Sequence, residues 1–178
     1  MNAVKEDERD ALVERLCGAC GFCCNGAIFH DAEVDDGAEG GWGAAAGLVF
    51  ERKRNGRLAL CQPCAAWSRS GHCRVHAQRP QPCRAFECRL LQDALAGVWD
   101  EGAATTRLRE ARQVFDRIEF LFDALEAPEP EAPLSRRWAA FLAQPIDLEV
   151  ESDERLDHRE ALMDAIERFQ TILARDFL

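Results

Sequence analysis

The most regular pattern of apolar positions lies in the second half of the chain. Between residues 105 and 125 one face carries Leu108, Ala111, Val114, Phe115, Ile118, Leu121, Phe122 and Leu125. Spacing of three and four residues is typical of an amphipathic α-helix, so we predict a helix there. Three prolines between Ala127 and Pro133 end it, since proline lacks the N–H that a helix needs. Further helices are predicted at about 135–143 and 152–177.

The first half is less regular. Apolar positions over residues 3–16 predict a short helix that leads into Cys17. Six glycines within residues 25–47 predict a long flexible loop. Apolar segments 48–51 and 57–60 flank Asn55-Gly56, a pair that accepts the positive φ values of a tight primed turn and so predicts a β-hairpin. A last helix is expected from near Cys83 to Leu95.

Length and pattern together predict the fold class. A chain of 178 residues can fold as one domain with a modest extension. We therefore expect an α+β protein that is mostly α, with an irregular N-terminal half stapled by metal and containing the small hairpin. The predicted domains are a cysteine-cluster, metal-chelating domain over residues 1–95 and a helical extension, residues 96–178, packed on it.

Charge excludes some functions. The net charge of −10 argues against general nucleic-acid binding, which depends on cations that neutralise phosphates. The average conceals a basic island, because residues 51–90 hold nine lysines and arginines against two acidic residues. No apolar run reaches the roughly 18 residues of a membrane span, and the acidic N-terminal segment is unlike an export signal. We expect a cytoplasmic protein with no membrane association.

Nine cysteines carry the candidate chemistry. In a reducing compartment clustered cysteines are more often metal ligands or redox groups than structural disulfides. They form two groups along the chain: Cys17, Cys20, Cys23 and Cys24, then Cys61, Cys64, Cys73, Cys83 and Cys88. Each group could hold one metal, or both could share a two-metal site. A vicinal disulfide between Cys23 and Cys24 is the redox alternative.

The order of these residues resembles a known family. The run Cys17-x2-Cys20-x2-Cys23-Cys24 is followed by Cys64, Cys73, Arg79-Pro80, Cys83-Arg84, Phe86 and Cys88. Residues 17–88 thereby resemble the cysteine-cluster (CxxCxxCC), YkgJ-like family of zinc- or iron-chelating domains. The resemblance implies eight metal ligands: Cys17, Cys20, Cys23, Cys24, Cys64, Cys73, Cys83 and Cys88. Cys61 lies outside the shared pattern, and the resemblance implies a site but no reaction.

Arginines and histidines supply further candidates. Arg79 and Arg84 could donate to thiolates or to a bound anion, or could pair instead with the acidic helices. His72 and His76 flank Cys73 closely enough to replace a sulfur ligand. His30 and His158 are isolated, which is typical of surface or core histidines.

Zinc is the leading cofactor because sulfur-rich tetrahedral sites suit it and because it would cross-link the segments of the irregular N-terminal half. The first alternative is an iron–sulfur electron-transfer or sensor protein, in which Cys83 or Cys88 completes a cluster begun at Cys17. The second is a non-haem iron enzyme with a partly open, cysteine-rich site covered by the glycine-rich loop. Besides metal ions, a protein partner on the helical half is possible.

Overall fold

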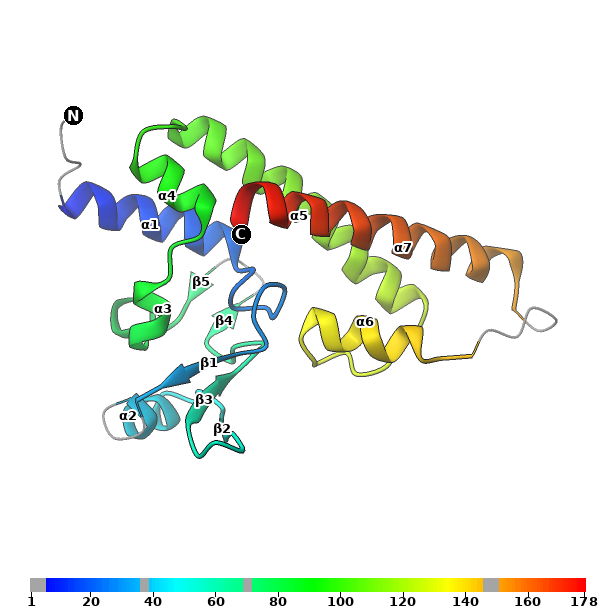
Figure 1. Cartoon of the computed structure of the whole chain (residues 1–178), viewed down its shortest axis with the longest axis horizontal. Coiled ribbons are helices and arrows are strands. Elements are labelled where there is room, and N and C mark those ends of the chain that lie inside the picture. Colours follow the sequence, from blue (N-terminus) through cyan, green and yellow to red (C-terminus); the bar gives the residue numbers. More distant parts are fainter. Residues whose placement is uncertain (1–5, 36–38, 69–71, 146–150) are drawn as a thin grey trace. The chain divides into compact units, whose positions relative to one another are not determined.

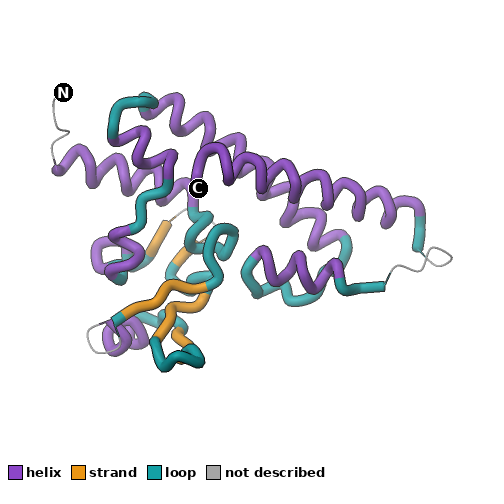
Figure 2. Tube along the Cα trace, viewed as in Figure 1, coloured by secondary structure: helices purple, strands orange, loops and turns teal. Residues whose placement is uncertain are grey.

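The computed structural model describes residues 6–35, 39–68, 72–145 and 151–178, and it confirms an α+β fold that is mostly α. The helices are α1 (Glu6–Cys20), α2 (Glu39–Ala45), α3 (Gln81–Ala85), α4 (Arg89–Leu95), α5 (Glu101–Ala124), α6 (Leu134–Leu142) and α7 (Asp153–Ile172). The strands are β1 (Asp31–Val34), β2 (Phe50–Arg52), β3 (Leu58–Cys61), β4 (Trp67–Ser68) and β5 (His72–Cys73). Figure 2 draws the described strands in orange, and the sequence colours of Figure 1 show that they lie in the first half of the chain.

Contacts divide the chain into two compact units, each described here by itself. The cysteine unit comprises residues 17–86 and 131–136, and the helical unit comprises residues up to 16, 87–130 and 137–178. The cysteine unit therefore includes a short segment from far along the chain. The predicted domains, 1–95 and 96–178, stay a prediction.

A small antiparallel sheet of strand order β1-β3-β2 supports the cysteine unit. Phe50 pairs with Leu60 and Arg52 with Leu58, which confirms the predicted hairpin. Its turn is not of the predicted primed type, because Gly56 alone takes a positive φ, +81°. The Gly56 N–H donates to Lys53 O at 2.9 Å, as in a turn that ends in a left-handed glycine.

The predicted loop over residues 25–47 is wrong in its described part. Asp31–Val34 forms strand β1, whose residues pair with β3 from Asp31↔Cys61 to Val34↔Leu58. Glu39–Ala45 forms helix α2. Gly43 of that helix packs so closely on Phe50 that a Cβ atom would lie 2.6 Å from the ring. The glycines thus permit close packing here.

The single helix predicted from Cys83 to Leu95 is also wrong. The chain forms the short helix α3, leaves helical geometry, and begins again as α4. Cys88 precedes α4 with extended backbone angles of φ −69° and ψ 162°. This break separates Cys83, in the cysteine unit, from Cys88, in the helical unit.

The helical unit is built on α5 and α7. All eight apolar residues predicted for the α5 face are buried, which confirms that helix. Its first turn is capped by Asp100, whose carboxylate accepts the Ala103 N–H at 2.7 Å. On α7, Leu162, Ile166 and Phe169 are buried in the same way. The predicted α6 and α7 are confirmed, and none of the described helices has the length and apolar composition of a membrane span.

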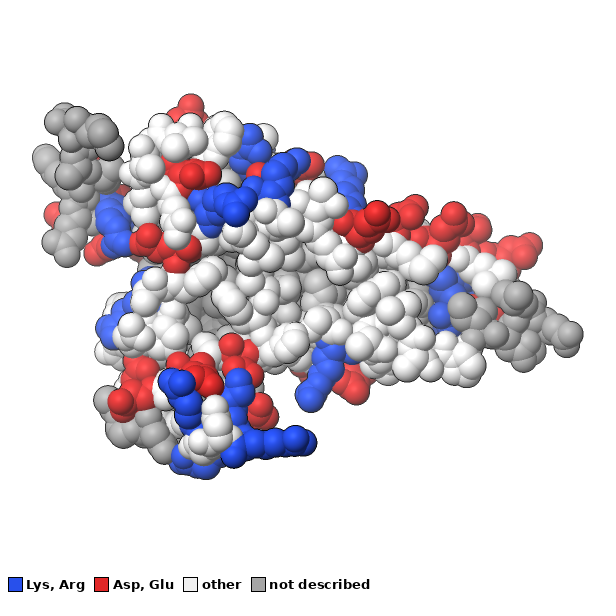
Figure 3. Space-filling model, viewed as in Figure 1, with Lys and Arg blue, Asp and Glu red and all other residues white. Residues whose placement is uncertain are grey.

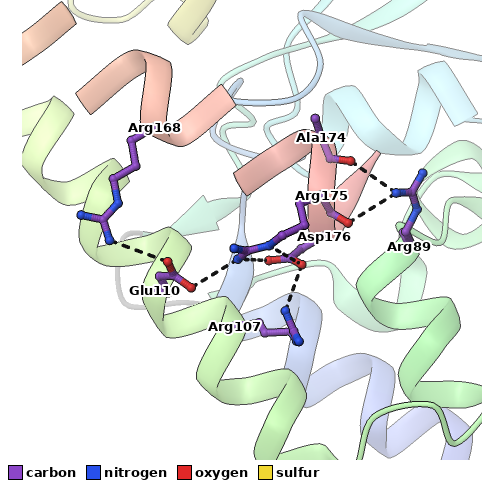
Figure 4. A network of polar contacts seen from close by, with 7 residues as sticks. All are labelled: Arg89, Arg107, Glu110, Arg168, Ala174, Arg175 and Asp176. Atoms are coloured by element: carbon purple, nitrogen blue, oxygen red, sulfur yellow. Dashed lines mark hydrogen bonds and ion pairs between the residues drawn. The ribbon is translucent and has the colours of Figure 1, made fainter. Parts of the chain in front are cut away.

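The last residues of the chain form a single π-helical turn, Leu173–Phe177, fixed by charged side chains (Figure 4). Arg89 donates to the backbone oxygens of Ala174 at 3.3 Å, Arg175 at 3.4 Å and Leu178 at 2.7 Å. The buried carboxylate of Asp176 accepts from Arg107 at 3.2 Å. The bonds from Arg89 satisfy backbone oxygens that a helix end otherwise leaves without partners.

Candidate metal centre

The first cysteine pair lies on a helix. Cys17 and Cys20 occupy the last turn of α1, three residues apart and therefore on one face. Gly18 is helical, whereas Gly21 ends the helix with a φ of +70°. A turn follows in which the Cys24 N–H donates to Gly21 O at 2.9 Å.

Trp67 packs directly on this turn. A Cβ atom added to Gly21 would lie 2.2 Å from the Trp67 ring, so only glycine fits. Phe22, the next residue, is fully buried. The end of α1 and strand β4 are therefore held in close contact by packing as well as by chain geometry.

Backbone pairing brings three further cysteine segments together. The Cys64 N–H donates to Cys24 O at 2.6 Å. The Trp67 N–H donates to Cys64 O at 3.0 Å, and the backbone N–H groups of Ala66 and Trp67 lower the pKa of the Cys64 thiol. Trp67 in turn pairs with Cys73 across strands β4 and β5. N–H donors of this kind also stabilise thiolates bound to a metal.

Cys83 completes the group from helix α3. Cys64, Cys73 and Cys83 all pack against the small apolar core formed by Val34, Leu48, Leu60 and Ala66. Four segments that are distant in sequence thus bring Cys24, Cys64, Cys73 and Cys83 to one region of the cysteine unit. We call these four residues the thiol cluster.

The pKa shifts of the cysteine thiols reflect this proximity. Burial raises the pKa of the Cys24 thiol well above its ordinary value, and the charges of Cys64, Cys23, Cys73 and Cys83 raise it further. Burial, with Cys64 and Cys73, raises the pKa of Cys83 to about 11. Burial is also the main reason why the pKa of Cys64 is raised. These thiols are protonated at neutral pH and would ionise together only near a compensating positive charge.

The thiol cluster has the donor chemistry of a metal site without its final geometry. Among the described side chains, no three from Cys, His, Asp or Glu converge closely enough to hold an ion. No disulfide joins any of the nine cysteines, so Cys23 and Cys24 do not form the vicinal disulfide considered above. Sulfur donors from four segments fit an ion that prefers thiolate, such as zinc.

The remaining cysteines have other surroundings. Burial raises the pKa of Cys61, and the acidic residues Glu51 and Asp31 raise it further. Burial raises the pKa of Cys88, while backbone N–H groups of Leu91 and Leu90 oppose that shift. As ligands, Cys17, Cys20, Cys23 and Cys88 stay predictions.

Of the charged residues around the thiol cluster, Arg74 and Glu39 were not predicted from the sequence. Arg79 lowers the pKa of Cys83 against the effect of burial, and its role beside a bound thiolate stays a prediction. Arg74, which sequence reasoning missed, lowers the pKa of Cys64 and also donates to Ala65 O at 2.7 Å. Glu39, a buried acid, faces Cys83 from α2. Arg84 is exposed, and its role stays a prediction.

Histidines contribute to structure in two places. His30 Nε2 hydrogen-bonds the hydroxyl of Ser135, and the Leu134 N–H donates to Gly26 O at 3.1 Å. These bonds hold the segment 131–136 in the cysteine unit. His158 lies edge-on to Phe120 in the helical unit, with ring centres 6.4 Å apart. The side chain of His72 lies outside the described part of the structure, so its ligand role stays a prediction, as does that of His76.

A mostly helical α+β chain that gathers free thiols from four segments has the architecture of a cysteine-rich metal-chelating protein. The family model CxxCxxCC, described as “Putative zinc- or iron-chelating domain”, matches residues 16–107, just over half of the chain. The chain belongs to this family, as its cysteine order indicates. Neither the curated proteins nor the solved structures contain a match.

Proposed function

We propose that the chain binds one zinc ion through the thiol cluster, Cys24, Cys64, Cys73 and Cys83. The observation that carries this proposal is that the charges of the other three thiols, together with that of the adjacent Cys23, raise the pKa of Cys24. Four partly buried thiols that raise one another's pKa in this way are unfavourable as anions unless a cation compensates them. Zinc bound to four thiolates would give that compensation and close a tetrahedral site.

The ion would also stabilise the fold of the cysteine unit. Its sheet is small and the segments that carry the cysteines are short, so metal binding would supply part of the folding free energy. Arg74 and Arg79 would offset the negative charge of a four-thiolate site. A second ion held by Cys17, Cys20 and Cys23 remains part of the proposal.

Metal analysis with an absorption spectrum on anaerobically purified protein tests the choice of metal. Colourless protein that contains zinc supports the proposal. Iron with acid-labile sulfide would replace it with an iron–sulfur electron-transfer or sensor protein. Iron without sulfide would favour a non-haem iron enzyme.

Serine substitutions test the ligands. Cys83→Ser should release the ion of the thiol cluster, because three thiolates and a hydroxyl bind zinc less well. Cys20→Ser should release the ion of a second site. Cys61→Ser should keep the wild-type metal content, since its neighbours are acids. Equal metal content in wild type, Cys83→Ser and Cys61→Ser would contradict this assignment.

A protein partner for the helical half also stays a proposal. Its support is that Val98, Phe120, Leu142 and Met163 remain exposed, at 60%, 54%, 57% and 49%. Exposed apolar side chains are often part of interaction surfaces.

A further inference from the structure

We propose that Glu39 is a positioning residue of the metal site: its carboxylate fixes the start of α3 so that Cys83 faces the rest of the thiol cluster. This inference rests on the proposed function. It assigns a role to an acidic residue that would otherwise oppose thiolate formation.

Glu39 is buried, with 7% of its surface exposed, and both of its carboxylate oxygens accept backbone hydrogen bonds. Oε2 accepts the Asp35 N–H at 3.2 Å, just after strand β1. Oε1 accepts the Gln81 N–H, at the first residue of α3. The side chain therefore joins the end of β1 to the start of the helix that carries Cys83.

The bond to Gln81 has no backbone substitute. Gln81 lies between Pro80 and Pro82, and proline has no backbone N–H, so Gln81 holds the one donor of this three-residue stretch. Pro80 makes no side-chain cap to α3. Glu39 thus provides the cap from another helix, two residues before Cys83.

The charge of Glu39 alone would work against metal binding. It raises the pKa of Cys83, as the neighbouring thiolates do, while Arg79 lowers it. A carboxylate near a thiolate site is unfavourable unless it serves through its geometry. The useful property of Glu39 is then hydrogen-bond acceptance, which the single oxygen of a glutamine amide retains at one of the two positions.

Four variants separate the effect of hydrogen-bond acceptance by Glu39 from the effect of its charge. Glu39→Ala removes the acceptor, and Gln81→Pro removes the donor at a first-turn position that suits proline. Glu39→Gln keeps an acceptor without the charge, and Gln81→Ala keeps the donor without the side chain. Affinity for Co²⁺ is measured by competition with a chelator, together with the thiolate-to-cobalt absorption bands and circular dichroism.

We expect Glu39→Ala and Gln81→Pro each to lower Co²⁺ affinity by about 10- to 100-fold and to alter the cobalt spectrum. The double variant Glu39→Ala/Gln81→Pro should be no weaker than Glu39→Ala, since Glu39→Ala already removes the bond that Gln81→Pro removes. Glu39→Gln should lose less affinity than Glu39→Ala, because its amide oxygen still accepts the Gln81 N–H. Gln81→Ala and Glu51→Ala, a change at an exposed acid of β2, should stay within about threefold of wild type.

Three results would overturn the role of Glu39. The first is wild-type affinity and spectrum in Gln81→Pro. The second is a loss in Glu39→Gln as large as in Glu39→Ala, which would mean that an acceptor for the Gln81 N–H does not position α3. The third is additive losses in the double variant. Failure of the wild-type protein to bind Co²⁺ or Zn²⁺ would instead reject the proposed function itself. If Glu39→Ala does not fold, Gln81→Pro and Glu39→Gln still test the positioning role of Glu39.

Discussion

At the residue scale, the cysteines differ in the charged groups that surround them. Cys24, Cys64 and Cys83 lie among other thiols, whereas Cys61 lies beside Glu51 and Asp31. The pKa of each of the first three is raised, mainly by burial, above the ordinary value of 9.0. These three thiols are therefore protonated at pH 7 in the metal-free protein, and a metal must displace their protons.

Zinc binding at pH 7 should release at least three protons per ion at the thiol cluster, from Cys24, Cys64 and Cys83. Because protons and zinc compete for the same sulfurs, the apparent affinity should fall as pH falls, by about a thousandfold per pH unit if three protons are displaced. An indicator dye in weak buffer measures the protons. Release of fewer than one proton per bound ion would exclude these thiols as ligands.

Gly21 should be intolerant of any side chain. Gly21→Ala places a Cβ atom 2.2 Å from the Trp67 ring and strains a φ of +70°. We expect the free energy of unfolding to drop by about 2–4 kcal/mol, from overpacking and left-handed strain. Gly47→Ala is the matched control.

At Gly47 the φ is +81°, but a Cβ atom would meet open space. That variant should cost only about 1–2 kcal/mol. Equal losses in the two variants, measured by urea unfolding, would show that the contact with Trp67 contributes nothing.

Sequence reasoning identified the residues of the site better than their grouping. Family resemblance picked out all four cysteines of the thiol cluster, because their order along the chain is distinctive. It did not show that Cys61 and Cys64, three residues apart, have different neighbours. Glu39 and Arg74 were missed, since an acid in a glycine-rich segment and one arginine among several give no local signal.

At the scale of elements, what could be predicted depended on whether the signal was local. The α5 helix follows from its own apolar period, and the hairpin follows from Asn55-Gly56 between two apolar segments. Strand β1 was missed because it forms by pairing with β3, about 30 residues later in the chain. The break between α3 and α4 was missed because the helical pattern continues through it.

The C-terminal π turn should depend on Arg89. Its guanidinium donates to three backbone oxygens of the last five residues. Arg89→Ala should lower the free energy of unfolding by about 1–2 kcal/mol, because hydrogen bonds to a charged donor are lost at an exposed site. Amide hydrogen exchange over residues 173–178 should accelerate.

Arg109→Ala is the control, because Arg109 is an exposed arginine of the neighbouring helix α5. It should change neither measurement. Unchanged exchange at residues 173–178 in Arg89→Ala would show that the π turn is held by its apolar contacts, such as those of the buried Phe177.

At the scale of the whole molecule, the two units have different sources of stability. The helical unit buries a long apolar interface between α5 and α7, including Leu108, Ile118 and Phe169. The cysteine unit has a small core centred on Val34, Leu48, Leu60 and Ala66, and a three-stranded sheet. Charge is also uneven: Figure 3 shows an acidic row along α7, where Asp157, Glu160 and Asp164 are exposed.

Removal of metal should therefore act on one unit only. With a strong chelator, amide exchange in β3 and α3 should accelerate by at least about tenfold, while α5 and α7 keep their protection. Hydrogen-exchange mass spectrometry measures the exchange of each unit separately. Equal acceleration in both units would mean that metal stabilises the chain as a whole, and no change would mean that it stabilises neither.

X-ray absorption at the metal edge of the purified protein tests the central claim most directly. If the thiol cluster holds a zinc ion, the first shell contains four sulfur atoms at about 2.3 Å, and Cys83→Ser loses one of them or the metal altogether. A shell made only of nitrogen and oxygen atoms, or a wild-type spectrum in Cys83→Ser, would contradict the claim.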